Sequence, residues 1–296
     1  MMMPETIDSP EFLTVRELAE PLRIKERKVY DLAASGEVPV SRATGKLLFP
    51  AREVRDWIER ARSGGKVEVA ARPPIVLGSH DPLLDWTIRQ SQSGLATFFD
   101  GSMDGLARFA RGEGIAAGLH IHDARSRSWN IVAASIMARD LNAVLVAFAS
   151  RRRGLVIGDG LPEPKGIADL AGLRVTPRQE DSGTAILFRE LAAEAGLDLA
   201  QVALQPVART EDDAVESVRR GESDVTFGLE SVARSFGLRF VPLIEEQYAL
   251  LVDRKAWFDS CFQKLITFCQ TDAFRQRAEG YGGYDVSEAG KVLWNA

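Results

Sequence analysis

The sequence predicts two units: a helix-turn-helix unit with a β-hairpin wing over residues 1–62, and an α/β body in two lobes over residues 74–296. Two observations predict this division. Helical patterns and a short glycine-containing hairpin fill the first unit, whereas strands alternate with helices in the second. Within the body, a strand, a turn of serine and glycine, and a helix follow one another three times. Such alternation builds a parallel sheet with ligands at the strand ends.

The composition is that of a globular protein. Hydrophobic residues make up 45% of the 296 residues and charged residues 27%, which permits a full core in at least one domain. No apolar run approaches the roughly 18 residues that span a bilayer, and the N-terminal segment lacks the basic and apolar parts of a signal peptide. Cys261 and Cys269 lie too far apart in an expected helix to form a disulfide, which fits a cytoplasmic location.

The two units differ in charge. Residues 1–65 contain 11 basic and 11 acidic side chains of the 37 and 42 in the chain, so the remaining 26 and 31 account for the net charge of −5. An acidic body argues against a protein that coats nucleic acid along its whole length.

Two helices joined by a tight turn open the N-terminal unit. Thr14 and Glu17 have the spacing of a capping box, and apolar residues at helical spacing continue to Leu22. A second helix is expected over residues 26–34, with Gly36 as its end. This order is typical of a helix-turn-helix motif.

A wing and a third helix are expected to complete this unit. Residues 38–42 and 47–49 read as the two strands of the wing, and Pro50 starts the third helix. The N-terminal part of the second helix meets base edges in such motifs, and basic residues on a wing reach phosphates. The candidate DNA contacts are Lys25, Arg27, Lys28, Tyr30, Arg42 and Lys46.

A family resemblance covers about residues 12–60, in the text LTVRELAEPLRIKERKVYDLAASGEVPVSRATGKLLFPAREVRDWIE. It resembles the excisionase-like, MerR-related helix-turn-helix family, which implies binding to double-stranded DNA. Pro21 late in the first helix, and Glu26 and Asp31 on the second, depart from the family pattern.

The linker is expected at residues 63–73, because Gly64 and Gly65 interrupt the helical pattern. In the first half of the body, strands are expected at residues 75–77, 97–99 and 115–121. The three histidines, His80, His120 and His122, lie near the ends of these strands. His120 and His122 with Asp123 have metal-ligating chemistry, but no cysteine or second carboxylate cluster supports a zinc site. The favoured interpretation is that one of these histidines has a structural role and another lies near the ligand site. No metal is expected.

The second half of the body is expected to cross into another lobe and return. The elements expected there are a helix at 129–139, strands at 143–149, 173–175 and 224–228, helices at 185–194 and 211–220, returning strands at 240–243 and 249–252, and a closing helix at 261–279. Ser182 and Thr184 are able to cap the helix that follows them, and its free N–H groups favour an anion. Two lobes joined by crossing strands enclose a cleft that closes over a ligand.

The body resembles the type 2 periplasmic-binding-protein fold over about residues 74–290. The matching segments are GSHDPLLD, GSMDGL, AGLHIHD with Trp129-Asn130, ADLAGLRV, DSGTAILF, RRGESDVTFGLE, FVPLIEEQYALLV and GYDVSEAG. More specifically, it resembles the cytoplasmic binding-protein-like family that is fused to helix-turn-helix units or to molybdopterin-biosynthesis modules. Asp181 departs from the glycine of the family turn and places a carboxylate beside the expected anion site.

The resemblance implies a set of ligand contacts. Related molybdate receptors hold a tetrahedral oxyanion with hydroxyls, backbone N–H groups and a hinge tyrosine. Position by position, this implies contacts from Ser79, Ser102, Ser182, Thr184 and Tyr248. The further candidates are His80, Met103, His120, Arg178 and Gly183.

We therefore expect a one-component transcription regulator that binds its operator as a homodimer or a higher homo-oligomer and senses a ligand in the cleft. Molybdate or tungstate is the ligand that the resemblance implies, and a small organic acid or another anion is the alternative. An enzyme is not expected, because paired carboxylates, a Cys/His pair and nucleotide-binding loops are missing. The DNA-binding unit argues against a transport receptor, and no cofactor is expected.

Overall fold

The computed structural model describes residues 12–43, 45–61 and 71–296. The chain divides into two compact units, residues 1–70 and 71–296, and each has its own hydrophobic core. Within the described residues, none of the helices has the length and hydrophobicity needed to traverse a lipid bilayer.

The N-terminal unit is a helix-turn-helix, as the sequence predicts. Its elements are β1 (Phe12–Leu13), α1 (Val15–Leu22), α2 (Glu26–Ser35), β2 (Phe49–Pro50) and α3 (Ala51–Arg60). The capping box at Thr14 is confirmed, because its hydroxyl oxygen accepts the N–H of Glu17 at 3.3 Å while the Glu17 carboxylate accepts the N–H of Thr14 at 2.8 Å. Leu18 and Val29, both fully buried, join the two helices in one core.

The wing is shorter than expected. A single antiparallel bridge joins Ser41 to Leu48, and Thr44 in the expected turn lies outside the described residues. Val38 is buried in the core of the unit, and Pro39 has no N–H for a strand ladder. The chain after the bridge instead pairs as β2 with β1, an N-terminal strand that the sequence pattern did not indicate.

One twisted sheet runs through the body. In the described residues it has ten strands in the order β10-β9-β11-β8-β12-β5-β3-β4, with β13 and β14 also paired to β8. Its strands are β3 (Ile75–Gly78), β4 (Ala96–Phe99), β5 (Ala116–Leu119), β8 (Ala143–Ile157), β9 (Arg174–Thr176), β10 (Ala203–Leu204), β11 (Val225–Leu229), β12 (Arg239–Asp253), β13 (Tyr284–Asp285) and β14 (Val292–Asn295). A separate hairpin is formed by β6 (His122–Asp123) and β7 (Ser128–Trp129).

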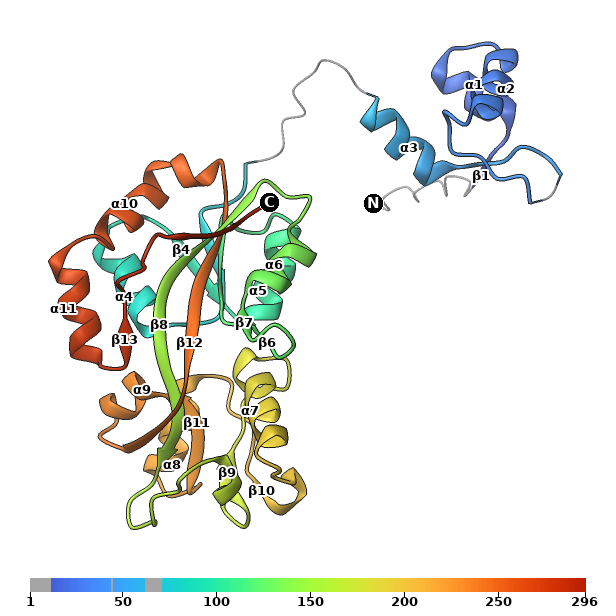
Figure 1. The fold of residues 1–296 in the computed structure, drawn as a ribbon. Coiled ribbons are helices and arrows are strands. Elements are labelled where there is room, and N and C mark those ends of the chain that lie inside the picture. Colours follow the sequence, from blue (N-terminus) through green and yellow to red (C-terminus); the bar gives the residue numbers. More distant parts are fainter. Residues whose placement is uncertain (1–11, 44, 62–70) are drawn as a thin grey trace, which may run out of the picture. The chain divides into compact units, whose positions relative to one another are not determined.

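Two long strands join the lobes. Figure 1 shows β8 and β12 running side by side through the length of the body, and they pair antiparallel from Arg239 to Asp253. The sequence suggested shorter, separate strands, because three arginines follow the apolar part of β8 and EEQ lies in the middle of β12. These charged residues do not end the strands, and Arg151 and Arg153 of β8 pair with Glu246 of β12 across them.

Helices flank the sheet in both lobes. They are α4 (Pro82–Gln90), α5 (Ser102–Ala110), α6 (Ile131–Met137), α7 (Gly183–Glu194), α8 (Glu211–Arg219), α9 (Glu230–Ser235), α10 (Ser260–Phe268) and α11 (Asp272–Tyr281), with short 3-10 turns η1 (Ile167–Leu170), η2 (Leu199–Gln201) and η3 (Ala256–Phe258). We define the first lobe by β3, β4, β5, α4, α5, α6, α10 and α11, and the second lobe by β9, β10, β11, α7, α8 and α9.

Two expected helices are different in the structure. The helix expected at 129–139 starts only at Ile131, because Asn130 has a φ of +65° and its side-chain oxygen accepts the N–H of Ile121 at 2.7 Å. The expected closing helix is two helices, since the Thr271 hydroxyl accepts the N–H of Phe274 at 3.3 Å and so caps a new one.

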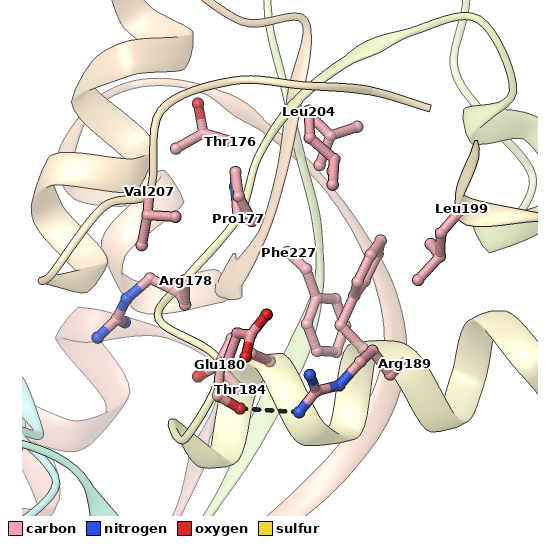
Figure 2. Close-up of a pocket in the computed structure, with 13 residues that line it drawn as sticks. Thr176, Pro177, Arg178, Glu180, Thr184, Arg189, Leu199, Leu204, Val207 and Phe227 are labelled. Carbon is pink, nitrogen blue, oxygen red and sulfur yellow. Dashed lines mark hydrogen bonds between the residues drawn. The ribbon is translucent and has the colours of Figure 1, made fainter. Parts of the chain in front are cut away.

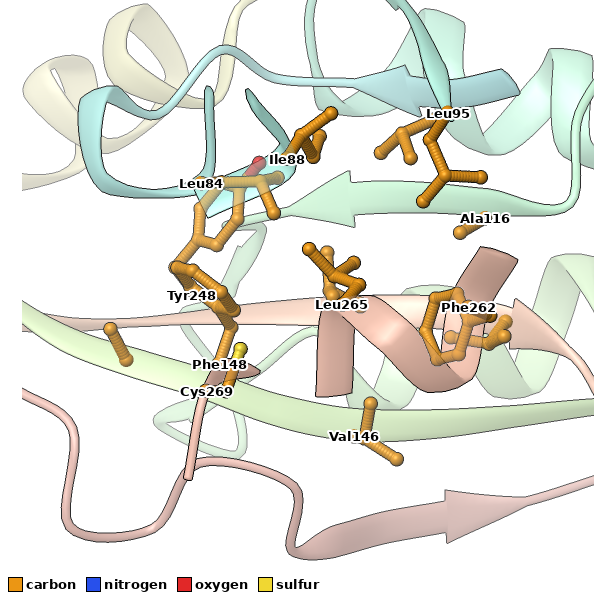
Figure 3. Close-up of a cluster of buried hydrophobic side chains, with 14 of the residues drawn as sticks. Leu84, Ile88, Leu95, Ala116, Val146, Phe148, Tyr248, Phe262, Leu265 and Cys269 are labelled. Atoms are coloured by element: carbon orange, nitrogen blue, oxygen red, sulfur yellow. The ribbon is translucent and has the colours of Figure 1, made fainter. Parts of the chain in front are cut away.

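The first lobe has its core on both faces of the sheet. Figure 3 shows Leu84 and Ile88 of α4, and Phe262 and Leu265 of α10, gathered around Tyr248 and Phe148 of the crossing strands. Full burial of one such side chain stabilises the fold by about 1.5–3 kcal/mol. A second cluster around Leu106 and Phe109 of α5 covers the opposite face.

The described end of the expected linker is attached to the body. The Arg72 guanidinium lies 4.4 Å from the centre of the Phe109 ring and donates to the carbonyl of Gly114 at 3.1 Å, and its Nε is 3.2 Å from Asp253. Most of the expected linker, residues 63–70, lies outside the described residues.

Candidate functional site

The first-lobe wall of the site is built on glycines. A Cβ on Gly78 would come within 2.2 Å of the Gly118 carbonyl, and one on Gly105 within 2.1 Å of the Gly78 Cα. Only glycine lets α5 and two strands approach so closely. This packing places Ser102, the first residue of α5, directly behind Ser79 at the end of β3.

A hydroxyl chain leads from this wall toward the cleft. The Ser102 Oγ accepts the backbone N–H of His120 at 3.0 Å and lies 2.8 Å from the Ser79 Oγ. Ser102 is fully buried and has no other acceptor in the described structure, so its O–H donates to Ser79. The Ser79 O–H is therefore left to donate to a bound group.

The second-lobe wall is the start of α7. Ser182 caps this helix by accepting the N–H of Ala185 at 3.1 Å, and its own O–H has no acceptor in the described residues. The backbone N–H groups of Gly183 and Thr184 are likewise without a hydrogen-bond partner there. The Thr184 hydroxyl donates to the Glu211 carboxylate at 3.0 Å, so this residue offers a bound anion its backbone N–H rather than its side chain.

These walls enclose one hollow between the lobes. It is lined by Ser79, His80, Phe99, Asp100, Gly101, His120, Arg178, Gln179, Ser182, Thr184, Arg209, Thr210 and Glu211. Three helices of the described body begin at it: Gly101 precedes α5, Ser182 precedes α7 and Thr210 precedes α8. Its volume is about 60 Å³. A ligand here would be small and would face the positive ends of three helix dipoles.

The expected ligand contacts fall into two groups. Ser79, His80, His120, Arg178, Ser182 and Thr184 line the hollow, and Gly183 lies against it. Ser102, Met103 and Tyr248 do not line it. Ser102 is hidden behind Ser79, and Met103 is 39% exposed elsewhere on α5. Tyr248 is 1% exposed, and its hydroxyl donates to the Ser79 carbonyl at 2.5 Å, so it holds Ser79 in place from behind the hollow.

A buried ion network lies beneath the hollow. Arg151 and Arg153 of β8 are each 1% exposed, and Glu246 of β12 is fully buried between them. Arg151 also donates to Asp81 of the first lobe, and Arg153 to Glu211 of the second, both at 2.8 Å. The chain of ion pairs thus connects the two lobes through the crossing strands.

The charges in this network hold each other ionised. Burial opposes ionisation of Glu246, but Arg151 and Arg153 keep the pKa of its carboxyl well below the usual value. At Glu211 burial also acts to raise the pKa of the carboxyl, but Arg153 and Arg178 outweigh it and lower the pKa to about 2. For His120 burial prevails and lowers the pKa, although its Nδ1 lies 3.2 Å from Glu246. Burial therefore favours the neutral form of the His120 ring, which faces the hollow.

This network was not predicted from the sequence. Successive side chains of a strand point to opposite faces, so Arg151 and Arg153, two positions apart, lie on the same face. This spacing in the sequence could have indicated a cluster of charge. The partner Glu246 lies 93 residues from Arg153, so no local pattern joins them.

Contacts between the lobes show a closed cleft. Arg209 beside α8 pairs with Asp100 beside β4 at 2.9 Å, and the His122 Nδ1 lies 2.7 Å from the Glu190 carboxylate of α7. His122 is thus engaged with the other lobe, while Asp123 accepts the N–H of Ser126 at 2.7 Å. Among the described residues, no cluster of His, Cys, Asp and Glu able to hold a metal is found.

The N-terminal unit presents its own candidate surface. Val29 and Ala33 of α2 are buried, so the opposite face of this helix, with Arg27, Lys28 and the 53% exposed Tyr30, is open to solvent. Lys25 precedes the helix, and Lys46 is exposed in the segment between the bridged residues Ser41 and Leu48. Arg42 donates to the Ala33 carbonyl at 3.1 Å, which ties this basic residue to the C-terminal end of α2.

Comparisons with known proteins agree with both units. A family described as a PBP superfamily domain matches residues 87–270, and one described as a helix-turn-helix domain matches residues 12–62. The uncharacterized protein YvgK of Bacillus subtilis (strain 168) is 22% identical over 300 residues, which cover 95% of this chain and 97% of that protein. An uncharacterized Clostridium pasteurianum protein from the ferredoxin 2Fe-2S gene 5′ region is 32% identical over 78 residues, 26% of this chain and 69% of that protein.

The chain is also similar to proteins of known structure. PhnD1 from Prochlorococcus marinus, in complex with methylphosphonate, has a TM-score of 0.49 and 13% identity, covering 72% of this chain and 92% of that one. The aliphatic sulphonate binding protein SsuA from Escherichia coli has a TM-score of 0.45 and 17% identity, covering 71% and 72%.

Proposed function

Because the chain belongs to the PBP superfamily and carries a helix-turn-helix DNA-binding domain in front of its ligand-binding domain, we propose that it is a one-component transcription regulator that senses a small oxyanion. Molybdate and tungstate are the proposed ligands. The protein is proposed to bind its operator as a homodimer, since helix-turn-helix proteins read paired half-sites.

The observation that carries the oxyanion proposal is the convergence of three helix N-termini on one small hollow. The free donors there are the hydroxyls of Ser79 and Ser182 and the backbone N–H groups of Gly183 and Thr184. Oriented dipoles of this kind bind an anion without a dedicated counter-charge. Arg178 adds a positive charge, which Glu211 at 3.1 Å largely balances.

Regulation follows from contacts made by both lobes. A ligand that touches Ser79 in the first lobe and Ser182 in the second binds the closed cleft more tightly than an open one, so it shifts the population toward the closed form. By linkage, the factor by which the ligand changes the affinity for DNA equals the factor by which DNA changes the affinity for the ligand. This design requires no catalytic step, in agreement with the non-enzymatic architecture of the two domains.

Titration calorimetry of the full chain with molybdate, tungstate, sulfate and phosphate tests the ligand. We expect binding of molybdate or tungstate, and a loss of about tenfold or more in affinity, equal to about 1.4 kcal/mol, in Ser79→Ala and in Ser182→Ala. Ser260→Ala is the matched control, because Ser260 is exposed on α10 and far from the hollow in the fold. Absence of heat from all four anions would remove the oxyanion proposal and favour a small organic acid.

A further inference from the structure

The second lobe contains another hollow outside the cleft, which we call the outer pocket. Figure 2 shows it between α7 and the edge of the sheet, with Phe227 at its base and Leu199, Leu204 and Val207 around its opening. Its volume is about 270 Å³, more than four times that of the cleft hollow. Val175, Phe188 and Phe227 of the lobe core form its inner wall, so the pocket reaches down to the core of this lobe.

The pocket exists because the edge of the sheet is irregular. Leu204 pairs with Val175, and the next bridge joins Ala208 to Arg178. The chain therefore advances four residues from Leu204 to Ala208 but only three from Val175 to Arg178. Pro206 lies in the extra length and has no N–H to donate to the neighbouring strand. As a result Leu204 and Val207 stand at the opening, 53% and 57% exposed, instead of closing the core.

The polar groups at the opening define the kind of ligand. Thr176 is not free to bind one, because its hydroxyl lies 2.7 Å from the Ser217 hydroxyl. The Arg178 guanidinium is used by Glu211 and by the carbonyls of Ala208 and Arg209. Arg189 donates to the carbonyl of Glu180 at 2.8 Å and forms no ion pair within the described residues. Glu180 also lines the pocket, and its exposed carboxylate forms no ion pair with Arg189 in the described residues. An apolar pocket with the Arg189 guanidinium at its rim fits a molecule with an apolar body and one carboxylate.

We propose that the outer pocket is a second effector site, for a small aromatic or branched aliphatic monocarboxylate. The ring or alkyl group lies against Phe188 and Phe227, and the carboxylate pairs with Arg189. A pocket of about 270 Å³, just below the usual range of about 300–1,000 Å³ for ligand sites, accommodates a molecule with a single ring.

The site is connected to the cleft. Its wall from Leu204 to Ala208 leads directly into Arg209, whose ion pair with Asp100 joins the lobes. Arg178 lines both hollows and holds the carbonyls of Ala208 and Arg209. A ligand that moves the wall also moves Arg209, so occupancy of the outer pocket changes the affinity of the cleft. This coupling, unlike the site itself, rests on the proposed function.

Calorimetric titration of the full chain with phenylacetate tests the site. We expect saturable binding that weakens at least tenfold in Arg189→Gln and in Leu204→Asp, both exposed positions outside the cleft. The control Arg220→Gln removes an exposed arginine of the same lobe that does not line the pocket, and it should bind phenylacetate as the wild type does. 2-Phenylethylammonium, with the opposite charge, should not bind.

Two results would overturn the site: no binding of phenylacetate, or equal binding by the wild type, Arg189→Gln and Leu204→Asp. Titration of molybdate with and without saturating phenylacetate tests the coupling, and an unchanged molybdate affinity would overturn that part. If molybdate does not bind but phenylacetate binds and is lost in Arg189→Gln, the outer pocket is supported and the oxyanion proposal fails.

Discussion

Gly183 at the start of α7 lies directly against His120 at the end of β5, across the cleft. A Cβ on Gly183 would come within 2.9 Å of both the carbonyl oxygen and the ring Cε1 of His120. The closed form of the body therefore needs a residue without a side chain at this position. Two lobes that each carry part of the site are brought together at one glycine.

Gly183→Ala is expected to disfavour the closed cleft. Inserting one methyl group into such a packed contact costs about 1–3 kcal/mol. If the lobes separate to relieve it, affinity for the cleft ligand falls by roughly five- to 150-fold, and small-angle scattering shows a larger body. Gly166→Ala is the control, because a Cβ there meets nothing within 4 Å. Wild-type affinity in Gly183→Ala would mean that ligand binding does not require this contact.

The turn at Ser182 and Gly183 was predictable because its signal is local. A helix cap depends on residues three positions apart, and the structure confirms Ser182 as the cap of α7. The ion network was not predictable in this way, since Arg153 meets Glu246 only after β8 and β12 pair. The hydrogen bond from Tyr248 to the Ser79 carbonyl was not predictable either, because the two residues lie 169 positions apart.

Glu246→Gln is expected to destabilise the body strongly. After this change, the buried Arg151 keeps only the carboxylate of Asp81 as an ion-pair partner, and the buried Arg153 keeps only that of Glu211. Breaking a buried ion pair by removing one charge costs about 3–5 kcal/mol, which urea unfolding should report. The neighbouring Glu245 is exposed, so Glu245→Gln should change the unfolding free energy by about 0.5 kcal/mol or less. Similar stability of the two variants would show that Glu246 is not needed to balance the arginines.

The stability of the body is expected to fall in two stages as the pH is lowered. His120 has a usual pKa of 6.5, and burial lowers its pKa in the folded protein. The unfolded chain then binds the proton first, so the contribution is complete above pH 6.5 and is lost as the pH falls below it. For Glu211, whose pKa falls from 4.5 to about 2, the contribution is complete above pH 4.5 and is lost toward pH 2.

Urea unfolding at a series of pH values measures both stages. In His120→Asn, the decrease that begins below pH 6.5 should become smaller, while the decrease below pH 4.5 should remain. An identical pH dependence in the wild type and in His120→Asn would show that His120 does not titrate between the folded and unfolded states.

The open face of α2 is expected to contact DNA bases. Arg27→Ala and Lys28→Ala should each weaken binding to the operator by about 1–3 kcal/mol if they read bases, whereas loss of a phosphate contact weakens all sequences alike and lowers the salt dependence. A gel-shift titration with the DNA upstream of the gene, at two stated salt concentrations, separates the two roles. Arg275→Ala, an exposed arginine of the body, is the control. Unchanged affinity in both α2 variants would place the base contacts on another element, with Lys46 as the next residue to test.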